Sequence, residues 1–191
     1  TDAEGNIVFS NSLVYRHGIM ELARDGLDVE FYSEQQIPAD LEEAGRNSVA
    51  AFELKERFFH IEYFRRKKDN KIIALEANLR PPGGPILDMM NYANDINIYQ
   101  EWANMIVTGK FDTTIYDSEK RKYFCDYIGR RYHHDYMFSH DEIMAKFGEY
   151  IVANEELPPL YREAMGDYCY IIRSPHWKVV AEVQAAILER K

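Results

Sequence analysis

One stretch of the sequence, residues 58–80, constrains the fold more than any other. Both of its ends, Phe58 to Phe64 and Lys71 to Arg80, are rich in apolar and aromatic residues. The link between them, Lys67-Lys68-Asp69-Asn70, is polar and carries turn-forming residues. Because strands with alternating side chains flank a turn here, the pattern predicts a β-hairpin.

The predicted strands gather polar side chains on one face. On the first strand, alternation places His60, Glu62 and Phe64 together. On the second strand, it separates an apolar row, made of Ile73, Leu75, Ala77 and Leu79, from a row that becomes polar towards its end, with Glu76, Asn78 and Arg80. With an odd-numbered loop such as Lys68-Asp69-Asn70, Glu62 lies directly across from Glu76.

Two opposed carboxylates repel unless something offsets their charge. A shared proton, a nearby base or a divalent cation would each do so, and an ordinary solvated face of polar residues is the simplest alternative. With the amide oxygen of Asn78, Glu62 and Glu76 form an all-oxygen donor set that suits Mg²⁺ or Mn²⁺. Arg80 then lies where a guanidinium can hold a carboxylate or phosphoryl oxygen.

The hairpin is followed by the loop Pro81-Pro82-Gly83-Gly84-Pro85. Glycines have no side chain to keep an anion away from the backbone N–H groups. Gly83 and Gly84 are therefore candidate anion-binding residues.

The rest of the chain predicts an α+β fold, because strands and helices mix without strict alternation. We expect strands at residues 6–9, 12–15, 29–32, 123–128 and 167–172. We expect helices from Pro38, over 86–110 in two pieces with Asp95 capping the second, over 141–150, and from Pro175 to about 189, with a loop at 154–159. The predicted division is a first subdomain over residues 1–110 and a smaller, strand-rich closing subdomain over 111–191 that ends in a helix.

Composition excludes several classes of protein. The net charge of −9 disfavours a broad nucleic-acid-binding face. No apolar run is long enough for a membrane span, and the polar start at Thr1 shows no signal peptide. Cys125 and Cys169 are expected to be reduced core thiols, in a cytoplasmic protein. A homodimer, with an interface formed by Tyr123, Tyr127, Tyr132 and Tyr136, is left open.

On these residues the sequence resembles the carboxy-terminal lobe of an ATP-grasp enzyme, over roughly residues 1–110. The resemblance rests on the Glu62 strand, the polar turn, the Glu76-x-Asn78-x-Arg80 strand, the loop to Gly84 and the helix at Asp88-Met89-Met90-Asn91. The layout is similar to that of biotin carboxylases and carbamoyl-phosphate synthetases. The sequence Arg80-Pro81-Pro82-Gly83-Gly84 is more similar to that of the carboxylate–amine ligases, such as the L-amino-acid ligases.

The resemblance implies a function and a site. Glu62, Glu76 and Asn78 would bind one or two Mg²⁺ (or Mn²⁺) ions that bridge the phosphates of ATP. Arg80 would be the catalytic residue that holds the acceptor carboxylate or its acyl phosphate, while Gly83, Gly84 and His60 would lie near phosphate or substrate. The partners would be ATP, a small-molecule carboxylate and an amine.

Two alternatives stay open beside this ligase. One is a carboxylase or carbamoyl-phosphate-type ATP-grasp enzyme, and the other is a non-catalytic nucleotide-binding module. The sequence shows no phosphate-contacting lysine, flexible glycine loop or adenine hinge of the second ATP-clamping lobe. We therefore expect about half of a catalytic unit, a fragment that does not turn over by itself.

A second metal cluster is also weighed, at His133-His134-Asp135 with His140-Asp141. Its spacing matches no standard zinc site. The segment His60-Ile61-Glu62 is similar to the H-x-E of zinc deaminases, but no P-C-x-x-C follows. A solvated loop or a partner contact is the simpler interpretation of residues 133–141.

Overall fold

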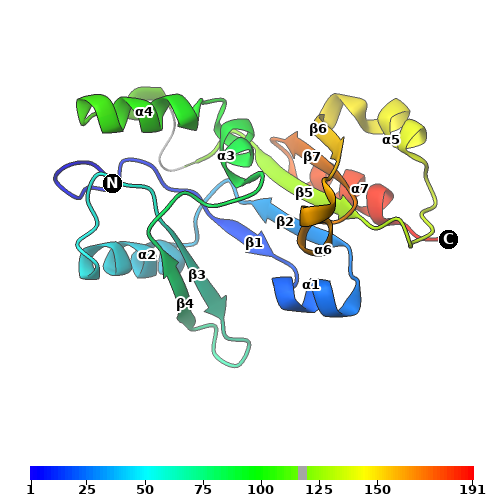
Figure 1. Cartoon of the computed structure of the whole chain (residues 1–191), viewed down its shortest axis with the longest axis horizontal. Helices are drawn as coiled ribbons and strands as arrows, with labels where there is room; N and C mark the ends of the chain where they lie inside the picture. Colours follow the sequence, from blue (N-terminus) through cyan, green and yellow to red (C-terminus); the bar gives the residue numbers. More distant parts are fainter. Residues whose placement is uncertain (116–119) are drawn as a thin grey trace. The chain divides into compact units, whose positions relative to one another are not determined.

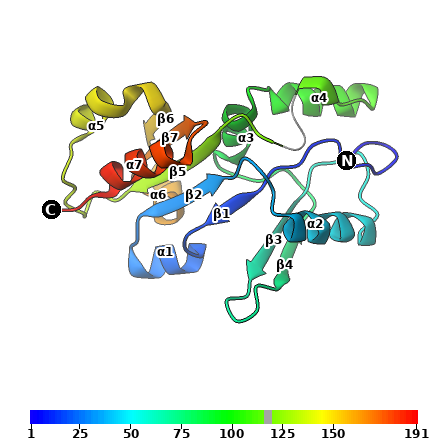
Figure 2. The ribbon, with the colours of Figure 1, turned by 180° about the vertical axis from the view of Figure 1, so that it is seen from behind.

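The computed structural model describes residues 1–115 and 120–191, except for the side chain of Ile19. The chain forms two compact units, each made of several segments. Figures 1 and 2 show the elements from opposite sides. Among the described residues, no helix has the length and apolar character needed to cross a membrane.

The first unit comprises Thr1–Asn11, Gln36–Asn91 and Asp95–Lys120. It contains helix α2 (Ala39–Ala51), strands β3 (His60–Arg65) and β4 (Ile72–Asn78), most of α3 (Ile86–Asn94), α4 (Ile98–Thr108) and the 3₁₀ helix η1 (Thr113–Ile115). β3 and β4 pair antiparallel as a two-stranded sheet, which confirms the predicted hairpin.

Helix α2 supports the hairpin from one side (Figures 1 and 2). The hydroxyl of Tyr63 on β3 donates to Ser48 Oγ at 2.8 Å and lies 3.2 Å from the carbonyl oxygen of Ala44. Arg65 forms a two-pronged contact with the Asp40 carboxylate, at 2.5 and 2.9 Å. A two-stranded hairpin is marginally stable alone, so this packing on the small-residue face of α2 is what holds it.

The second unit comprises Ser12–Gln35, Tyr92–Asn94 and Arg121–Lys191. Its sheet is antiparallel throughout, with strand order β1-β2-β5-β7-β6. The strands are β1 (Leu13–Tyr15), β2 (Val29–Ser33), β5 (Phe124–Arg130), β6 (Ile151–Glu156) and β7 (Tyr168–Ser174). The helices are α1 (Ile19–Asp25), α5 (His140–Phe147), α6 (Pro159–Met165) and α7 (Trp177–Leu188), with the 3₁₀ helix η2 (Gly148–Tyr150).

The main core of the second unit lies between the sheet and two helices. Buried side chains of β5 and β7 pack against those of α5 and α7. The strands contribute Ile128, Tyr170 and Ile172, and the helices contribute Ile143, Phe147, Val180, Val183, Ala186 and Ile187. On the other face of the sheet, Phe31 stacks on Tyr15 and Tyr127, with ring centroids 4.8 and 4.7 Å away. Both faces of β5 are therefore buried, which suits its central place in the sheet.

A glycine pair lets α6 approach β5. A Cβ on Gly129 would lie 2.1 Å from the carbonyl oxygen of Met165, closer than any side chain tolerates. Gly166 follows with φ of +91°, and a Cβ there would meet the backbone of Gly129 at 2.8 Å. These two positions accept only glycine without local rearrangement.

Several predicted elements differ from the structure. No strand forms at residues 6–9, whereas α1 was not predicted. The predicted loop at 154–159 contains the end of β6 and the start of α6. Asp95 does not cap α4: it is the left-handed C-cap of α3, and Asn97 caps α4 by accepting from Gln100 N at 3.1 Å.

The division into units also differs from the predicted boundary at residues 110 and 111. Residues 12–35 belong with the second unit because β2 pairs antiparallel with β5. Both cysteines are free and buried, as expected. Cys125 pairs with Arg173 and Cys169 with Gly129 in the β5–β7 ladder, so the two thiols are not cross-strand neighbours.

Candidate metal centre

The register of the hairpin brings the two predicted carboxylates together. Glu62 pairs with Glu76, and His60 pairs with Asn78. The predicted pairing is confirmed, but the connection is different. Arg66 N donates to Lys71 O at 2.9 Å, which leaves the even-numbered loop 67–70, with Asn70 in the left-handed region at φ of 56°.

A β-bulge restores the register that the even-numbered loop would otherwise lose. The pairing passes from Glu62↔Glu76 to Tyr63↔Ala74, so Leu75 is an extra residue on β4. The bulge reverses the alternation on the turn side, so Ile73, opposite Phe64, shares the face of Glu62 and Glu76. The prediction that Ile73 belongs to the opposite, apolar row was wrong for this reason.

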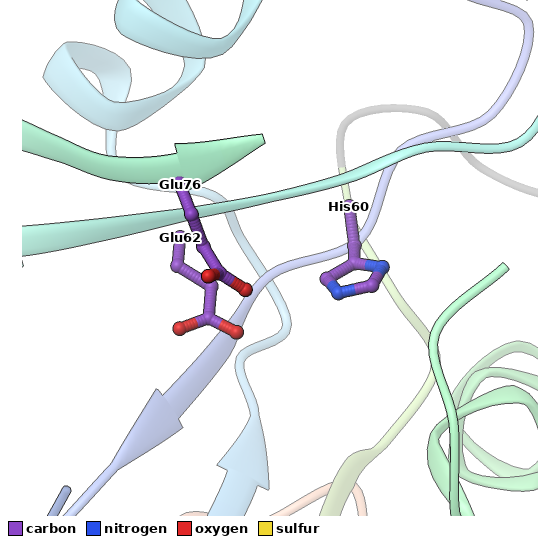
Figure 3. Close-up of side chains that lie close together, drawn as sticks. All are labelled: His60, Glu62 and Glu76. Carbon is purple, nitrogen blue, oxygen red and sulfur yellow. The ribbon is translucent and has the colours of Figure 1, made fainter. Parts of the chain in front are cut away.

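Three side chains converge on this face. One potential ligand atom from each of His60, Glu62 and Glu76 lies within 4.8 Å of the other two. Figure 3 shows the two carboxylates side by side, with one ring nitrogen of His60 turned towards them. Both glutamates are exposed and His60 is half-buried. Within residues 1–115 and 120–191 this is the one such group of three or more.

Asn78 and Arg80 occupy different positions relative to the cluster. The Asn78 amide donates to Glu76 Oε1 at 2.6 Å, so Asn78 is part of the site. Arg80 lies two residues beyond Asn78, the last residue of β4, and its guanidinium donates to the carbonyl oxygen of Pro81 at 3.0 Å. The strand pairing ends at Asn78, so alternation alone does not fix the direction of the Arg80 side chain.

The glycine loop follows directly. Gly84 has φ of +61°, a conformation that favours glycine, and a Cβ on Gly83 would meet nothing within 4 Å. Both glycines are exposed. Their role in binding an anion stays a prediction.

The donor set fits a divalent cation. Two carboxylates face each other across the strands, and the contact to Glu76 from an uncharged amide does not cancel their like charges. Carboxylate and amide oxygens are hard donors that suit Mg²⁺. Glu62, Glu76 and Asn78 are the residues that would hold the ion, and His60 lies beside the two glutamates.

The second candidate cluster does not assemble. His134 Nδ1 lies 3.0 Å from the Asp28 carboxylate, whereas His140 Nδ1 lies 3.0 Å from the hydroxyl of Tyr170. Tyr136 also donates to Asp28, at 2.5 Å. These contacts join separate elements of the second unit and leave no common point for an ion.

The face that carries Glu62 and Glu76, the acid face of the hairpin, also carries an apolar pair, of which the sequence predicted Phe64 but not Ile73. Phe64 and Ile73 are 58% and 41% exposed and pair with each other. The bulge at Leu75 brings Ile73 to this face, and no residue of the segment signals it. Tyr127 was one of four tyrosines considered for a homodimer interface. It is 1% exposed and belongs to the core.

Comparison with known proteins identifies a fold but no sequence family. No protein-family model and no curated protein matches the sequence. The chain is similar to the structure of an L-amino acid ligase from Bacillus licheniformis, with a TM-score of 0.64 and 9% identity, over 83% of this chain and 42% of that one. It is also similar to phosphoribosylglycinamide synthetase from Anaerococcus prevotii, with a TM-score of 0.54 and 11% identity, over 85% and 44%.

Both of these proteins are ATP-grasp enzymes, and the chain has an ATP-grasp-like fold. The predicted fold class, α+β with antiparallel sheets packed with helices, is confirmed. At such identities the likeness shows the fold alone. The chain spans less than half the length of either structure.

Proposed function

We propose that this chain carries the metal- and substrate-binding half of an ATP-dependent ligase. The ligase activates a carboxylate as an acyl phosphate with Mg-ATP and joins it to an amine. The observation that carries the proposal is the Glu62–Glu76 pair, with His60 and Asn78, on an open face of a hairpin in an ATP-grasp-like fold.

The residues divide the work. Glu62, Glu76 and Asn78 hold the divalent cation, which neutralises phosphate charge when bound. The exposed pair of Phe64 and Ile73 gives the same face an apolar surface on which a planar base can pack.

The reaction has two steps. A carboxylate oxygen attacks the γ-phosphorus, the bond to the β,γ-bridging oxygen breaks, and ADP leaves. The amine nitrogen then attacks the acyl carbon, phosphate leaves, and the amine loses a proton. Arg80 is free to swing from Pro81 O, an exposed contact, onto the acceptor carboxylate or the acyl phosphate.

The first test is ion binding. Glu76→Gln should remove most of the affinity for a divalent cation, measured by calorimetry with Mn²⁺. The control is Glu42→Gln on α2. The Glu42 carboxylate forms an ion pair with Arg46 of the same helix, at 2.5 Å, and is not part of the hairpin. Full retention of Mn²⁺ binding by Glu76→Gln overturns the metal assignment.

The second test is turnover by the full-length gene product. ADP and phosphate release is measured across a grid of carboxylates and amines with Mg²⁺. Release that requires one acid and one amine together supports the ligase. Release with bicarbonate alone favours the carboxylase-type alternative, and nucleotide binding without release favours the binding module.

A further inference from the structure

His60 is the one member of the cluster whose role the all-oxygen site leaves open. It pairs with Asn78 across the strands, one pair further from the turn than Glu62 and Glu76. A ring nitrogen lies within 4.8 Å of an oxygen of each glutamate. In a hard Mg²⁺ site a histidine at this position would be unnecessary, because Mg²⁺ prefers oxygen ligands and water.

A second contact orients the ring. His60 Nδ1 lies 3.3 Å from the carbonyl oxygen of Arg80, which can only accept, so Nδ1 carries the proton that is donated. Nε2 of the neutral ring is then left with its lone pair. Histidines that bind metals commonly donate their other ring N–H to a backbone carbonyl in this way.

The distances also suit a shared ion. Ligand atoms about 2.1 Å from an octahedral ion lie about 3 Å apart when adjacent and about 4.2 Å apart when opposite. The separations in the structure are at most 4.8 Å, and rotation of the exposed glutamate side chains can shorten them while His60 keeps its contact with Arg80 O.

We propose that His60 is a nitrogen ligand of the cation at this site, and that it makes the site favour Mn²⁺ over Mg²⁺. The inference rests on the proposed metal role of Glu62 and Glu76. It predicts a mixed set of one imidazole and two carboxylates, in which the imidazole adds affinity for Mn²⁺ much more than for Mg²⁺.

The test compares Mn²⁺ and Mg²⁺ binding by calorimetry, with the metal chlorides alone as probes. His60→Gln should lower Mn²⁺ affinity at least about 10-fold and Mg²⁺ affinity less than about 3-fold. The matched control is His17→Gln, because His17 also lies beside a carboxylate, 3.9 Å from Glu21, and outside the hairpin. The control should bind both ions as the unaltered chain does.

A spectroscopic readout makes the test independent of the variant's folding. Pulsed electron paramagnetic resonance of Mn²⁺ bound to the unaltered chain should show coupling to a histidine nitrogen, and the coupling should vanish in His60→Gln. Absence of that coupling, or an unchanged Mn²⁺-to-Mg²⁺ affinity ratio in His60→Gln, overturns the role of His60. If Glu76→Gln still abolishes ion binding in that case, the proposed function stands; if the unaltered chain binds neither ion, both fail.

Discussion

Removing one charge from the Glu62–Glu76 pair should have opposite effects on stability with and without a divalent ion. Glu62→Gln is the cleaner perturbation, because Glu76 also accepts from Asn78. Two unit charges 4.8 Å apart, the upper limit of the measured separation, repel by about 0.9 kcal/mol in water. Physiological salt reduces this to about half. In EDTA, Glu62→Gln should therefore stabilise the first unit by about 0.5–1 kcal/mol.

With Mn²⁺ present the sign should reverse. An ion that binds only the folded state at 100 times its Kd stabilises that state by about 2.7 kcal/mol. The unaltered chain gains this free energy, while Glu62→Gln loses most of it with the lost ligand. The variant should then unfold at a lower urea concentration than the unaltered chain.

The assay is urea unfolding followed by tryptophan fluorescence. Trp102 lies in the first unit and Trp177 in the second. Trp177→Phe, introduced into every protein compared, leaves Trp102 as the reporter of the unit that holds the hairpin. Two results would refute the opposed-charge account. One is a Glu62→Gln variant less stable than its parent in EDTA; the other is a stability difference between variant and parent that is the same in EDTA and in Mn²⁺.

Three further predictions concern stability. Gly129→Ala should destabilise the second unit by about 3 kcal/mol or more in urea unfolding, because its Cβ would lie 2.1 Å from Met165 O. Gly45→Ala should stabilise the first unit by up to about 1 kcal/mol, because Gly45 lies inside α2 and a Cβ there would meet nothing within 4 Å. A Gly129→Ala chain of unchanged stability would disprove the close approach. Burial, reinforced by the Glu30 carboxylate, raises the pKa of Asp126 well above its usual range. The protonated carboxyl therefore contributes its full stability below about pH 4, and this contribution is lost as the pH rises through the raised pKa. Asp126→Asn should abolish this loss, which amounts to about 1.4 kcal/mol per pKa unit; an unchanged pH profile from pH 4 upwards, read by Trp177 fluorescence, would contradict it.

The hairpin was predictable because its signals are local. Alternation in β3 and β4 and the polar turn lie within residues 58–80, and they are sufficient to place His60 and Glu62 on one face. The bulge at Leu75 was not predictable, since an apolar residue in a strand fits a regular ladder equally well. The predicted pairing of Glu62 with Glu76 was therefore confirmed, although the predicted loop length and the predicted face of Ile73 were wrong.

The missed elements depend on contacts between distant segments. β6 ends in the polar residues Asn154, Glu155 and Glu156, which read as a loop, and it is a strand because it pairs with β7 at the edge of the sheet. The assignment of residues 12–35 to the second unit depends on the pairing of β2 with β5, across about 95 residues of chain. Local patterns carry no information on such pairings.

The claim that the acid face of the hairpin is a metal site can be tested most directly by Mn²⁺-induced broadening of amide signals in nuclear magnetic resonance spectra. Sub-stoichiometric MnCl₂ is added to the ¹⁵N-labelled chain, with Glu76→Gln as the comparison. The account predicts broadening that is strongest at residues 60–62 and 76–78 and weakens with distance from them, and that is lost in the variant. Broadening centred on other acidic residues, or an identical pattern in Glu76→Gln, would contradict it.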